Sequence, residues 1–354
     1  MSDRLPTGAT IGILGGGQLG RMLSVAAARL GYKCCILDPS DDPPAAHVAN
    51  FHLKAAYDDV DALTRFARSV DVVTYEFENI PTDALDTIER HCPIRPGREA
   101  LRVSQDRLTE KTWLADLGLS PAPFADVADR AALDAALAEL GTPAILKTRR
   151  FGYDGKGQVR IDDVSEADAA WDAISGAPAV LEGFVAFERE ISVIAARGLD
   201  GSIACYDPGE NEHVDGILRK TTVPAAVSHS VATDAVLLAG RILNALEYVG
   251  VMGIELFVTK DGLLVNEIAP RVHNSGHWTQ DGAPVDQFEQ HIRAIAGLPL
   301  GDGSRSGDIT MENLIGDDVD GIDAILRDPS ASLHLYGKGA ARPGRKMGHV
   351  NRRR

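Results

Sequence analysis

The sequence predicts an α/β protein in which a domain built on a parallel β-sheet precedes a mixed α+β part. The N-terminal residues follow the order strand, glycine-rich turn, helix and strand, at residues 9–14, 15–20, 21–30 and 33–37. This order is that of a βαβ unit, and a third apolar run at residues 70–75 extends its sheet. The pattern changes after a segment rich in Pro, Gly and Arg at residues 93–99, which we take as a domain junction.

Composition narrows the possible functions. The chain has 354 residues and a formal net charge of −15, which argues against general binding to nucleic acid or to membrane surfaces. Basic pockets for anionic metabolites must therefore be local. The first 14 residues lack the features of a signal peptide and no apolar run approaches a membrane span, so we expect a cytoplasmic protein. The four cysteines lack metal-ligand spacing and are expected to be reduced structural thiols.

The glycine-rich turn matches G-x-G-x-x-G, with glycines at 15, 17 and 20. Asp38 lies near the distance at which an acidic residue holds the ribose of NAD, so a dehydrogenase is one hypothesis. The motif by itself indicates only a helix N-terminus whose free amides can bind a phosphate.

Polar residues follow the strand at residues 70–75. Glu76 and Asn79 lie at the carboxyl end of the predicted parallel sheet, where ligands of such sheets bind. They are candidates for binding a ribose or a small polar ring. The alternative is that Asn79 caps a helix that begins near Thr82.

A second glycine-rich loop, at residues 152–158, follows a short strand that ends in Lys147. Glycines let the backbone approach phosphate oxygens, and Lys147 and Lys156 supply positive charge, so this segment suits a polyphosphate. A Walker motif is absent. The alternative, a flexible charged surface hairpin, fits poorly with the cations that precede the loop.

The densest group of polar residues, at 266–278, follows a predicted hairpin with one glutamate in each arm. We expect a three-residue loop centred on Asp261, which pairs Glu255 with Glu267; a two-residue Asp-Gly turn would place them on opposite faces. Two facing carboxylates repel unless they are protonated or bridged by a cation, and oxygen ligands of this kind suit Mg²⁺ bound to nucleotide phosphates. The alternative is a solvated pair on the strand surface.

Taken together, these motifs resemble the ATP-grasp ligases, and within them the family of 5-(carboxyamino)imidazole ribonucleotide synthases. The resemblance rests on motifs spread over most of the chain: residues 15–21, 152–158, Glu182, Glu190, 216–219, Glu255, Glu267 and 270–278. It implies an ATP-grasp fold, α/β with an α+β nucleotide-gripping part, a Rossmann-like N-terminal domain and a small C-terminal lobe. The implied domains are a Rossmann-like domain at residues 1–100, a central lid subdomain at 101–185, and a catalytic subdomain with the C-terminal lobe at 186–354.

The resemblance also implies an activity. The enzyme would use ATP and bicarbonate to carboxylate the exocyclic amine of 5-aminoimidazole ribonucleotide in purine synthesis, releasing ADP and phosphate. Carboxyphosphate, the expected intermediate, decomposes quickly in water, so the loop at residues 152–158 is expected to act as a lid.

Roles for individual residues follow from the family pattern. The nucleotide is assigned to Arg107, Lys147, Gly152, Tyr153, Asp154, Gly155, Lys156, Gly157, Gln158, Glu182, Gly183, Phe184, Val185, Glu190, His213, Asn266 and Glu267. Mg²⁺ is assigned to Glu255 and Glu267. Catalysis is assigned to Tyr153, Asp154, Lys156, Arg271 and His273, and either Asp154 or His273 could take the amine proton. The ribonucleotide is assigned to Gly17, Gln18, Leu19, Glu76, Asn79, Arg271, Asn274, Ser275, Arg345 and Lys346.

The C-terminal residues 338–354 contain seven Lys or Arg and no acidic residue. A basic tail of this kind is often only solvated charge or a nucleic-acid arm. The resemblance instead implies that Arg345 and Lys346 meet the ribonucleotide phosphate opposite the first glycine turn. Family members generally continue with a further helix, so a shortened C-terminal lobe, or one completed by a partner subunit, is expected, together with a homodimer.

Three other hypotheses remain open. A related ATP-grasp enzyme would use formate on glycinamide ribonucleotide. A dehydrogenase would bind NAD through residues 15–20 and Asp38 but leaves Lys147 and the glutamate pair without a role. A non-catalytic scaffold would bind ATP without turning it over.

Overall fold

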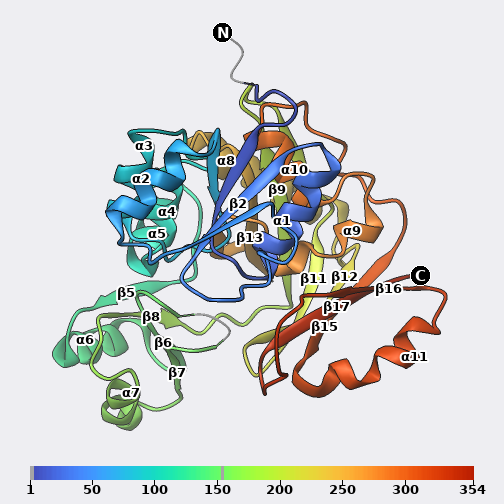
Figure 1. The fold of residues 1–354 in the computed structure, drawn as a ribbon. Helices are drawn as coiled ribbons and strands as arrows, with labels where there is room; N and C mark the ends of the chain where they lie inside the picture. The colour runs from blue at the N-terminus through green and yellow to red at the C-terminus, as the bar shows by residue number, and fades with distance from the viewer. Residues whose placement is uncertain (1–3, 153–154) are drawn as a thin grey trace.

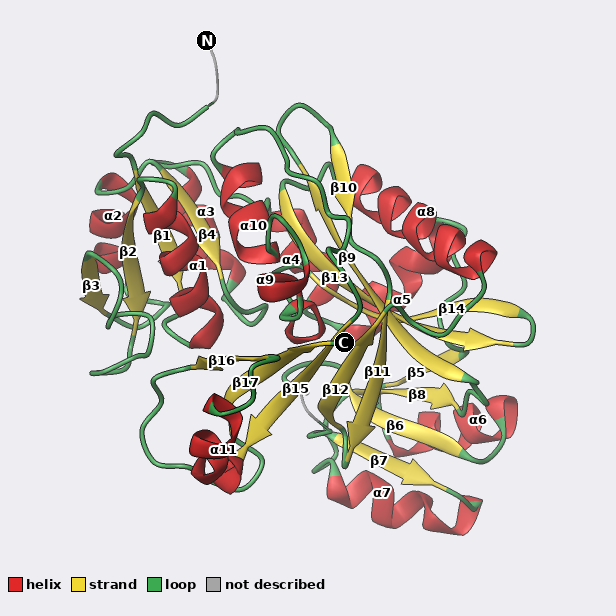
Figure 2. Cartoon of the chain, turned by 90° about the vertical axis from the view of Figure 1, so that its right-hand side faces the viewer, coloured by secondary structure: helices red, strands yellow, loops and turns green. Residues whose placement is uncertain are grey.

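The computed structural model describes residues 4–152 and 155–354, and within them it contains three β-sheets with helices packed against them (Figure 1). Tyr153 and Asp154 lie outside the described residues. The N-terminal parallel sheet, a small antiparallel sheet and the long C-terminal sheet lie around a common centre, to which each contributes loops or strand ends (Figure 2).

The first sheet is parallel, with the strand order β3-β2-β1-β4. Its strands are β1 (Thr10–Leu14), β2 (Lys33–Asp38), β3 (Phe51–Lys54) and β4 (Val72–Tyr75). Its helices are α1 (Gln18–Arg29), α2 (Val60–Arg68) and α3 (Thr82–Glu89). The inner strands are almost continuously apolar because helices cover both faces of the sheet. The prediction for the first helix was wrong at its start: α1 begins at Gln18, inside the expected turn, because Gly17 is its N-cap.

The second sheet is a four-stranded antiparallel sheet with the order β5-β8-β6-β7. Its strands are β5 (Phe124–Val127), β6 (Ala144–Thr148), β7 (Gln158–Ile161) and β8 (Ala179–Gly183). Helices α6 (Arg130–Leu140) and α7 (Ala167–Ala173) cover one face and form a small core with it. The sheet therefore has an apolar side of its own and presents its other side, with Lys147, to the rest of the molecule.

The third sheet has nine strands and runs from the centre of the molecule to the C-terminus. Its strands are β9 (Arg189–Arg197), β10 (Ile203–Cys205), β11 (Gly209–Val214), β12 (Ile217–Val223), β13 (Gly250–Thr259), β14 (Gly262–Ala269), β15 (Ile309–Ile315), β16 (Ala331–Leu335) and β17 (Lys346–Arg353). The remaining α-helices are α4 (Arg98–Ser104), α5 (Arg107–Asp116), α8 (His229–Ala245), α9 (Thr279–Gly282), α10 (Gln287–Ile295) and α11 (Ile322–Leu326).

Alternation along β9 explains how two layers of helices pack on the third sheet. Val193 and Ala195 belong to the core cluster that includes α8, whereas Ile194 and Ala196 belong to the cluster that includes α1 and α10. Successive side chains of a strand point to opposite faces, so both faces of β9 are buried. This strand and its neighbour β13 are thereby held from both sides, which gives the site a rigid floor.

The segment taken as a domain junction is partly helical. Helix α4 begins at Arg98, within the segment taken as a junction, and α5 follows at Arg107. Asp106 caps α5 by accepting hydrogen bonds from the backbone N–H groups of Leu108 and Thr109, at 3.0 and 3.2 Å. The cap fixes the direction in which α5 leaves toward β14.

The β13–β14 hairpin pairs Glu255 with Glu267, as expected, but the predicted loop was wrong. The connection is a two-residue turn, Lys260 and Asp261, and Thr259 pairs with Gly262. The register then shifts because Leu256 pairs with Val265 while Glu255 pairs with Glu267, so Asn266 is the extra residue of a β-bulge. The bulge, and not the turn, brings the two glutamates onto one face.

No helix among residues 4–152 and 155–354 is long and apolar enough to cross a membrane. The four cysteines are unpaired, and burial raises the pKa of the Cys34 and Cys92 thiols to about 12.

His291 on α10 connects the first sheet to the third. Its Nδ1 accepts a hydrogen bond from the backbone N–H of Val251 at 3.0 Å, so its Nε2 carries the proton and donates to Thr74 Oγ1 at 2.8 Å. Burial lowers the pKa of His291 to about 3. Protonation of Nδ1 would also break the bond to Val251, so the folded protein keeps this ring neutral.

We predict a pH dependence of stability from His291. The unfolded chain binds a proton here as the pH falls below about 6.5, and the folded protein does not, so the free energy of unfolding falls by about 2 kcal/mol between pH 7 and pH 5 from this residue alone. The His291→Leu variant should be less stable at both pH values, but its decline between them should be shallower by about that amount. Urea denaturation at pH 5 and pH 7 measures the difference. His91→Leu, at an exposed position, should keep the wild-type decline; an equal decline in all three proteins would contradict the assignment.

Candidate active site

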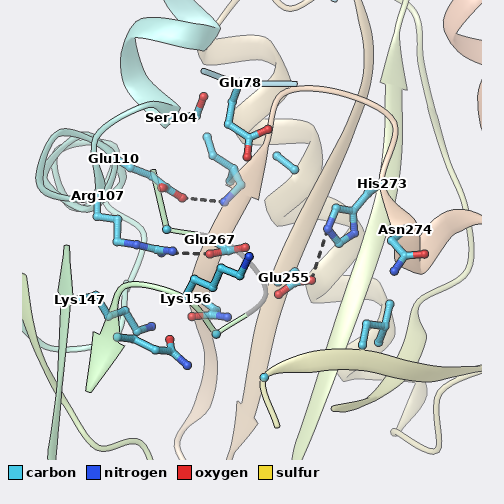
Figure 3. A pocket seen from close by; sticks show the side chains of 18 of the residues that line it. Glu78, Ser104, Arg107, Glu110, Lys147, Lys156, Glu255, Glu267, His273 and Asn274 are labelled. Atoms are coloured by element: carbon cyan, nitrogen blue, oxygen red, sulfur yellow. Dashed lines mark hydrogen bonds and ion pairs between the residues drawn. The ribbon is translucent and has the colours of Figure 1, made fainter. Parts of the chain in front are cut away.

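A cavity of about 620 Å³ lies where the three sheets meet (Figure 3). Its wall includes the ends of the first sheet near Glu76, strand β6 with Lys147, and the floor formed by β13 and β14. Lys346, at the start of β17, completes it. Segments distant in the sequence therefore contribute polar side chains to one space.

The two glutamates of the hairpin lie side by side on the cavity floor. Burial raises the pKa of Glu255, and the neighbouring charge of Glu267 raises it further. Burial acts in the same direction on Glu267, but Arg107 and Lys147 outweigh it and hold the pKa of Glu267 below its usual range. The pair thus carries one charge readily and a second only when another cation is present.

Arg107 comes from the first turn of α5 and pairs with Glu267, with Nη1 3.1 Å from Oε2. Its backbone N–H donates to the carbonyl of Arg149 at 2.9 Å, which ties α5 to the end of β6. The guanidinium is therefore held beside Glu267 (Figure 3).

Glu182 lies between two lysines in the interior. Lys147 Nζ is 2.8 Å from Glu182 Oε2, and Lys111 Nζ is 3.0 Å from Oε1. Burial by itself would raise the pKa of Glu182, yet the two lysines hold it at about 2. The carboxylate is therefore ionised at neutral pH and keeps Lys147 in place at the edge of the cavity.

On the opposite side of the floor, His213 of β11 meets Glu190 of β9, with Nδ1 2.8 Å from Oε2. Burial lowers the pKa of His213, but the hydrogen bond to Glu190 and the nearby Glu255 outweigh it, so the pKa lies above its ordinary value. Both residues line the cavity.

The segment after β14 supplies a second group of polar residues. Arg271 pairs with Glu78 of the first domain, with Nε 2.7 Å from Oε2. His273 Nε2 lies 3.6 Å from Glu255 Oε1, and its Nδ1 lies 2.8 Å from Ser275 Oγ. Burial, with the charge of Arg271, lowers the pKa of His273 to about 3. The imidazole is therefore neutral at physiological pH.

The first glycine turn is occupied by carboxylates of the protein itself. Glu76 accepts hydrogen bonds from the backbone N–H groups of Gly17 and Gly20, the latter at 2.6 Å, and Asp38 Oδ2 accepts from that of Gly16 at 2.8 Å. Gly15, at φ +102°, could not carry a side chain, because a Cβ atom there would lie 2.5 Å from Cγ of Glu76. The positive end of α1 is thus neutralised from within.

Most of the residues singled out from the sequence line the cavity. They are Gln18, Leu19, Glu76, Asn79, Arg107, Lys147, Gly152, Gly155, Lys156, Gln158, Glu190, His213, Glu255, Asn266, Glu267, Arg271, His273, Asn274 and Lys346. The cavity wall does not include Gly17, Gly157, Glu182, Gly183, Phe184, Val185, Ser275 or Arg345. Tyr153 and Asp154 lie outside the described residues. Asn79 does not cap α3, whose N-cap is Pro81 without a side-chain hydrogen bond, so that alternative was wrong.

Several cavity residues were not singled out from the sequence. Phe187 and Phe257 stack with ring centroids 4.8 Å apart and form an apolar wall. Phe257 lies two residues after Glu255 on β13, so strand alternation could have placed it on the same face. Glu78 lies in the bend that follows β4, two residues after Glu76. Glu110 gave no such signal, because it reaches the site from a helix.

The donor set on the floor fits a divalent cation with oxygen ligands. Two carboxylates face each other, and Oδ1 of neighbouring Asn266 is buried without a hydrogen-bond partner among the described residues. Oδ1 and Nδ2 of Asn274 are also buried without a hydrogen-bond partner among the described residues. Native proteins pair nearly all buried polar atoms, so these amides indicate a polar ligand.

Family models match three parts of the chain. A ribonucleotide synthetase preATP-grasp domain matches residues 8–105, an ATP-grasp domain matches residues 112–288, and a phosphoribosylaminoimidazole carboxylase C-terminal domain matches residues 310–353. The matches follow the order of the sequence and reach almost to its end.

Two similar bacterial proteins carry the same name. The chain is 57% identical to N5-carboxyaminoimidazole ribonucleotide synthase of Brucella melitensis over 351 residues, which covers 98% of this chain and 97% of the relative. It is 44% identical to the Pseudomonas aeruginosa enzyme of that name, over 97% of this chain and 94% of the relative.

Solved structures agree. An ADP complex of an N5-carboxyaminoimidazole ribonucleotide synthetase superposes with a TM-score of 0.97 at 42% identity and covers all of this chain and 94% of that one. An Aspergillus clavatus N5-carboxyaminoimidazole synthase in complex with ADP and 5-aminoimidazole ribonucleotide superposes with a TM-score of 0.93 at 32% identity, over 98% of this chain and 94% of that one. From the cavity, the three matched domains and these relatives together, the chain belongs to the N5-carboxyaminoimidazole ribonucleotide synthase family of ATP-grasp ligases.

Proposed function

We propose that this protein carboxylates the exocyclic amine of 5-aminoimidazole ribonucleotide with ATP and bicarbonate, and releases ADP and phosphate. The observation that carries the proposal is that one cavity contains three groups of residues. They are the cations around Lys147, which suit phosphates, the pair of glutamates on the floor, and the polar segment from Arg271 to Asn274. Names of family members support the reaction, and the crystal complex with ADP and the aminoimidazole ribonucleotide supports the two organic ligands.

The nucleotide is assigned to the side of the cavity below the lid. Lys147 and Arg107 provide charge for its phosphates, and the glycine-containing loop after β6 can approach them closely. Glu190 and His213 offer a hydrogen-bonding pair for ribose hydroxyls. Backbone groups at the exit of β8, from Glu182 to Val185, remain the proposed contacts of the adenine.

Mg²⁺ is assigned to Glu255 and Glu267. Bound to these carboxylates and to phosphate oxygens, the ion would neutralise charge that develops as the γ-phosphoryl group leaves ATP. The repulsion that raises the pKa of Glu255 would be relieved by such a cation.

The ribonucleotide is assigned to the other side, between the first sheet and the start of β17. Gln18, Leu19, Glu76 and Asn79 would contact its ribose and ring, and Lys346 its phosphate. Asn274 and Ser275 belong to the same proposed group, as does Gly17. Arg345, whose Nη1 donates to the carbonyl of Ala340 at 3.0 Å, would have to turn to join Lys346.

The chemistry proceeds in two steps. A bicarbonate oxygen attacks the γ-phosphorus of ATP, which gives ADP and carboxyphosphate. The amine nitrogen then bonds to the carboxyl carbon, the C–O bond to phosphate breaks, and the amine loses a proton. Arg271 would stabilise the departing phosphate, and His273 or Asp154 would take the proton. Tyr153 and Lys156, on the lid, would shield carboxyphosphate from water.

We also propose that the protein works as a homodimer in the cytoplasm. The support for the dimer is the resemblance to the family, and light scattering of the purified protein tests it. The net charge of −15 supports the expectation that nucleic acid is not a partner.

Phosphate release from Mg·ATP tests the reaction. We expect release that requires both bicarbonate and 5-aminoimidazole ribonucleotide, with an acid-labile carboxylated product. Parallel assays with formate and glycinamide ribonucleotide test the related ligase. Release only in those assays, or no release in any, would refute the proposal.

We predict that Glu267→Ala lowers the turnover number by roughly a hundredfold or more, because it removes one of the proposed Mg²⁺ ligands. The far-UV circular dichroism spectrum should be unchanged. Glu139→Ala, on the exposed side of α6, should have the wild-type rate. A near-normal rate for Glu267→Ala at low Mg²⁺ would rule out the metal assignment.

We predict that Lys346→Met raises the KM for 5-aminoimidazole ribonucleotide about 10- to 100-fold, the effect of losing one charge-assisted hydrogen bond, and leaves the KM for ATP unchanged. Arg345→Met tests whether the neighbouring guanidinium also binds the phosphate. A similar rise in KM would mean that Arg345 leaves the carbonyl of Ala340 when the ribonucleotide binds. Equal changes in both KM values for Lys346→Met would place the lysine on the nucleotide instead.

A further inference from the structure

β14 is an edge strand of the third sheet, so backbone groups on its outer side are paired from outside the hairpin. Asn266 is the extra residue of its bulge, and Glu267 follows it. Two backbone groups flank Glu267: the carbonyl of Asn266 and the N–H of Ile268. Each forms a hydrogen bond with a side chain of helix α5.

Two consecutive residues of α5 form these bonds. Lys111 Nζ donates to the carbonyl of Asn266 at 3.2 Å, and Glu110 Oε1 accepts from the N–H of Ile268 at 2.6 Å (Figure 3). Glu110 is 4% exposed and Lys111 1% exposed. Burying two ionisable side chains costs free energy that an apolar helix face would not, so packing alone does not account for them.

Lys111 also joins the bulge to the second sheet, because the same ammonium pairs with Glu182 at 3.0 Å. Glu182 in turn holds Lys147. One buried lysine thus contacts the strand that bears Glu267 and the carboxylate that fixes Lys147.

We propose that Glu110 and Lys111 are positioning residues that hold the bulge of β14, so that Asn266 and Glu267 face the nucleotide and its metal ion. The inference rests on the proposed function, which places the nucleotide in this cavity. Without the bulge, the residues of β14 after Val265 would pair with β13 one position further along. A shift of one residue turns a side chain to the other face of a sheet.

Glu110 offers the sharper test, because its carboxylate bonds to the backbone of β14, whereas Lys111 also pairs with Glu182. Glu110→Gln keeps an acceptor oxygen for the N–H of Ile268. Glu110→Met has a side chain of similar volume without the acceptor oxygen. Glu110→Asp keeps a carboxylate, but the side chain is one methylene shorter and the oxygen lies farther from the N–H. Leu114→Ala is the matched control: it is a buried apolar residue of the same helix, in the core cluster around α8.

The experiment measures ADP affinity by calorimetry, with Mg²⁺ and with a chelator, beside thermal stability and hydrogen exchange of the peptide that contains residues 262–269. With Mg²⁺, Glu110→Met should bind ADP at least tenfold more weakly than the wild type, and the difference should shrink with the chelator. Exchange in β14 should be faster. Glu110→Gln should stay within about threefold of the wild type, since one neutral hydrogen bond is conserved. Leu114→Ala should lose thermal stability and keep its Mg²⁺-dependent affinity.

Each other result overturns one idea and not both. If Glu110→Met, or Glu110→Asp should the methionine variant not fold, binds Mg·ADP as tightly as the wild type, the positioning role is wrong. If Leu114→Ala loses as much Mg²⁺-dependent affinity, the effect is one of stability and the role is again wrong. If the wild type itself does not bind Mg·ADP, the proposed function fails.

Discussion

The site depends on one buried carboxylate, Glu182, and on the two lysines that neutralise it. A lone charge at this depth would be prohibitive, so β6, β8 and α5 must meet for any of the three groups to be tolerated. The same meeting places Lys147 close enough to lower the pKa of Glu267. Packing of the second sheet against α5 and the lowered pKa of Glu267 on the cavity floor are therefore consequences of a single arrangement.

A common pattern of charge runs through the cavity. Arg107 is paired with Glu267, Lys147 with Glu182 and Arg271 with Glu78. These cations are held in position by partners before a phosphate arrives, which reduces the reorganisation needed to bind one. Local pairing of this kind also explains how a chain with a net charge of −15 can accept polyanions.

Motifs whose function depends on neighbours in sequence were predictable, and contacts between distant elements were not. The order of the N-terminal elements and the pairing of Glu255 with Glu267 followed from patterning, although the pairing arises from a bulge at Asn266 and not from the expected loop. The dehydrogenase hypothesis was wrong because a G-x-G-x-x-G match does not reveal what fills the turn, which here is Glu76. Likewise, the approach of α5 to β14 depends on three-dimensional packing. The sequence therefore did not distinguish Glu110 from a glutamate on the exposed side of a helix.

The two-residue tip of the β13–β14 hairpin is separated from the glutamates by the bulge. Lys260 and Asp261 are exposed, and the register near Glu267 is held by hydrogen bonds from a helix on the other side of the strand. Insertions at the tip should therefore leave the strand register near Glu267 unchanged, since surface loops tolerate insertions at small free-energy cost. The hairpin tip is thus a natural place to insert a tag or a fluorescent label that reports on the site without disturbing it.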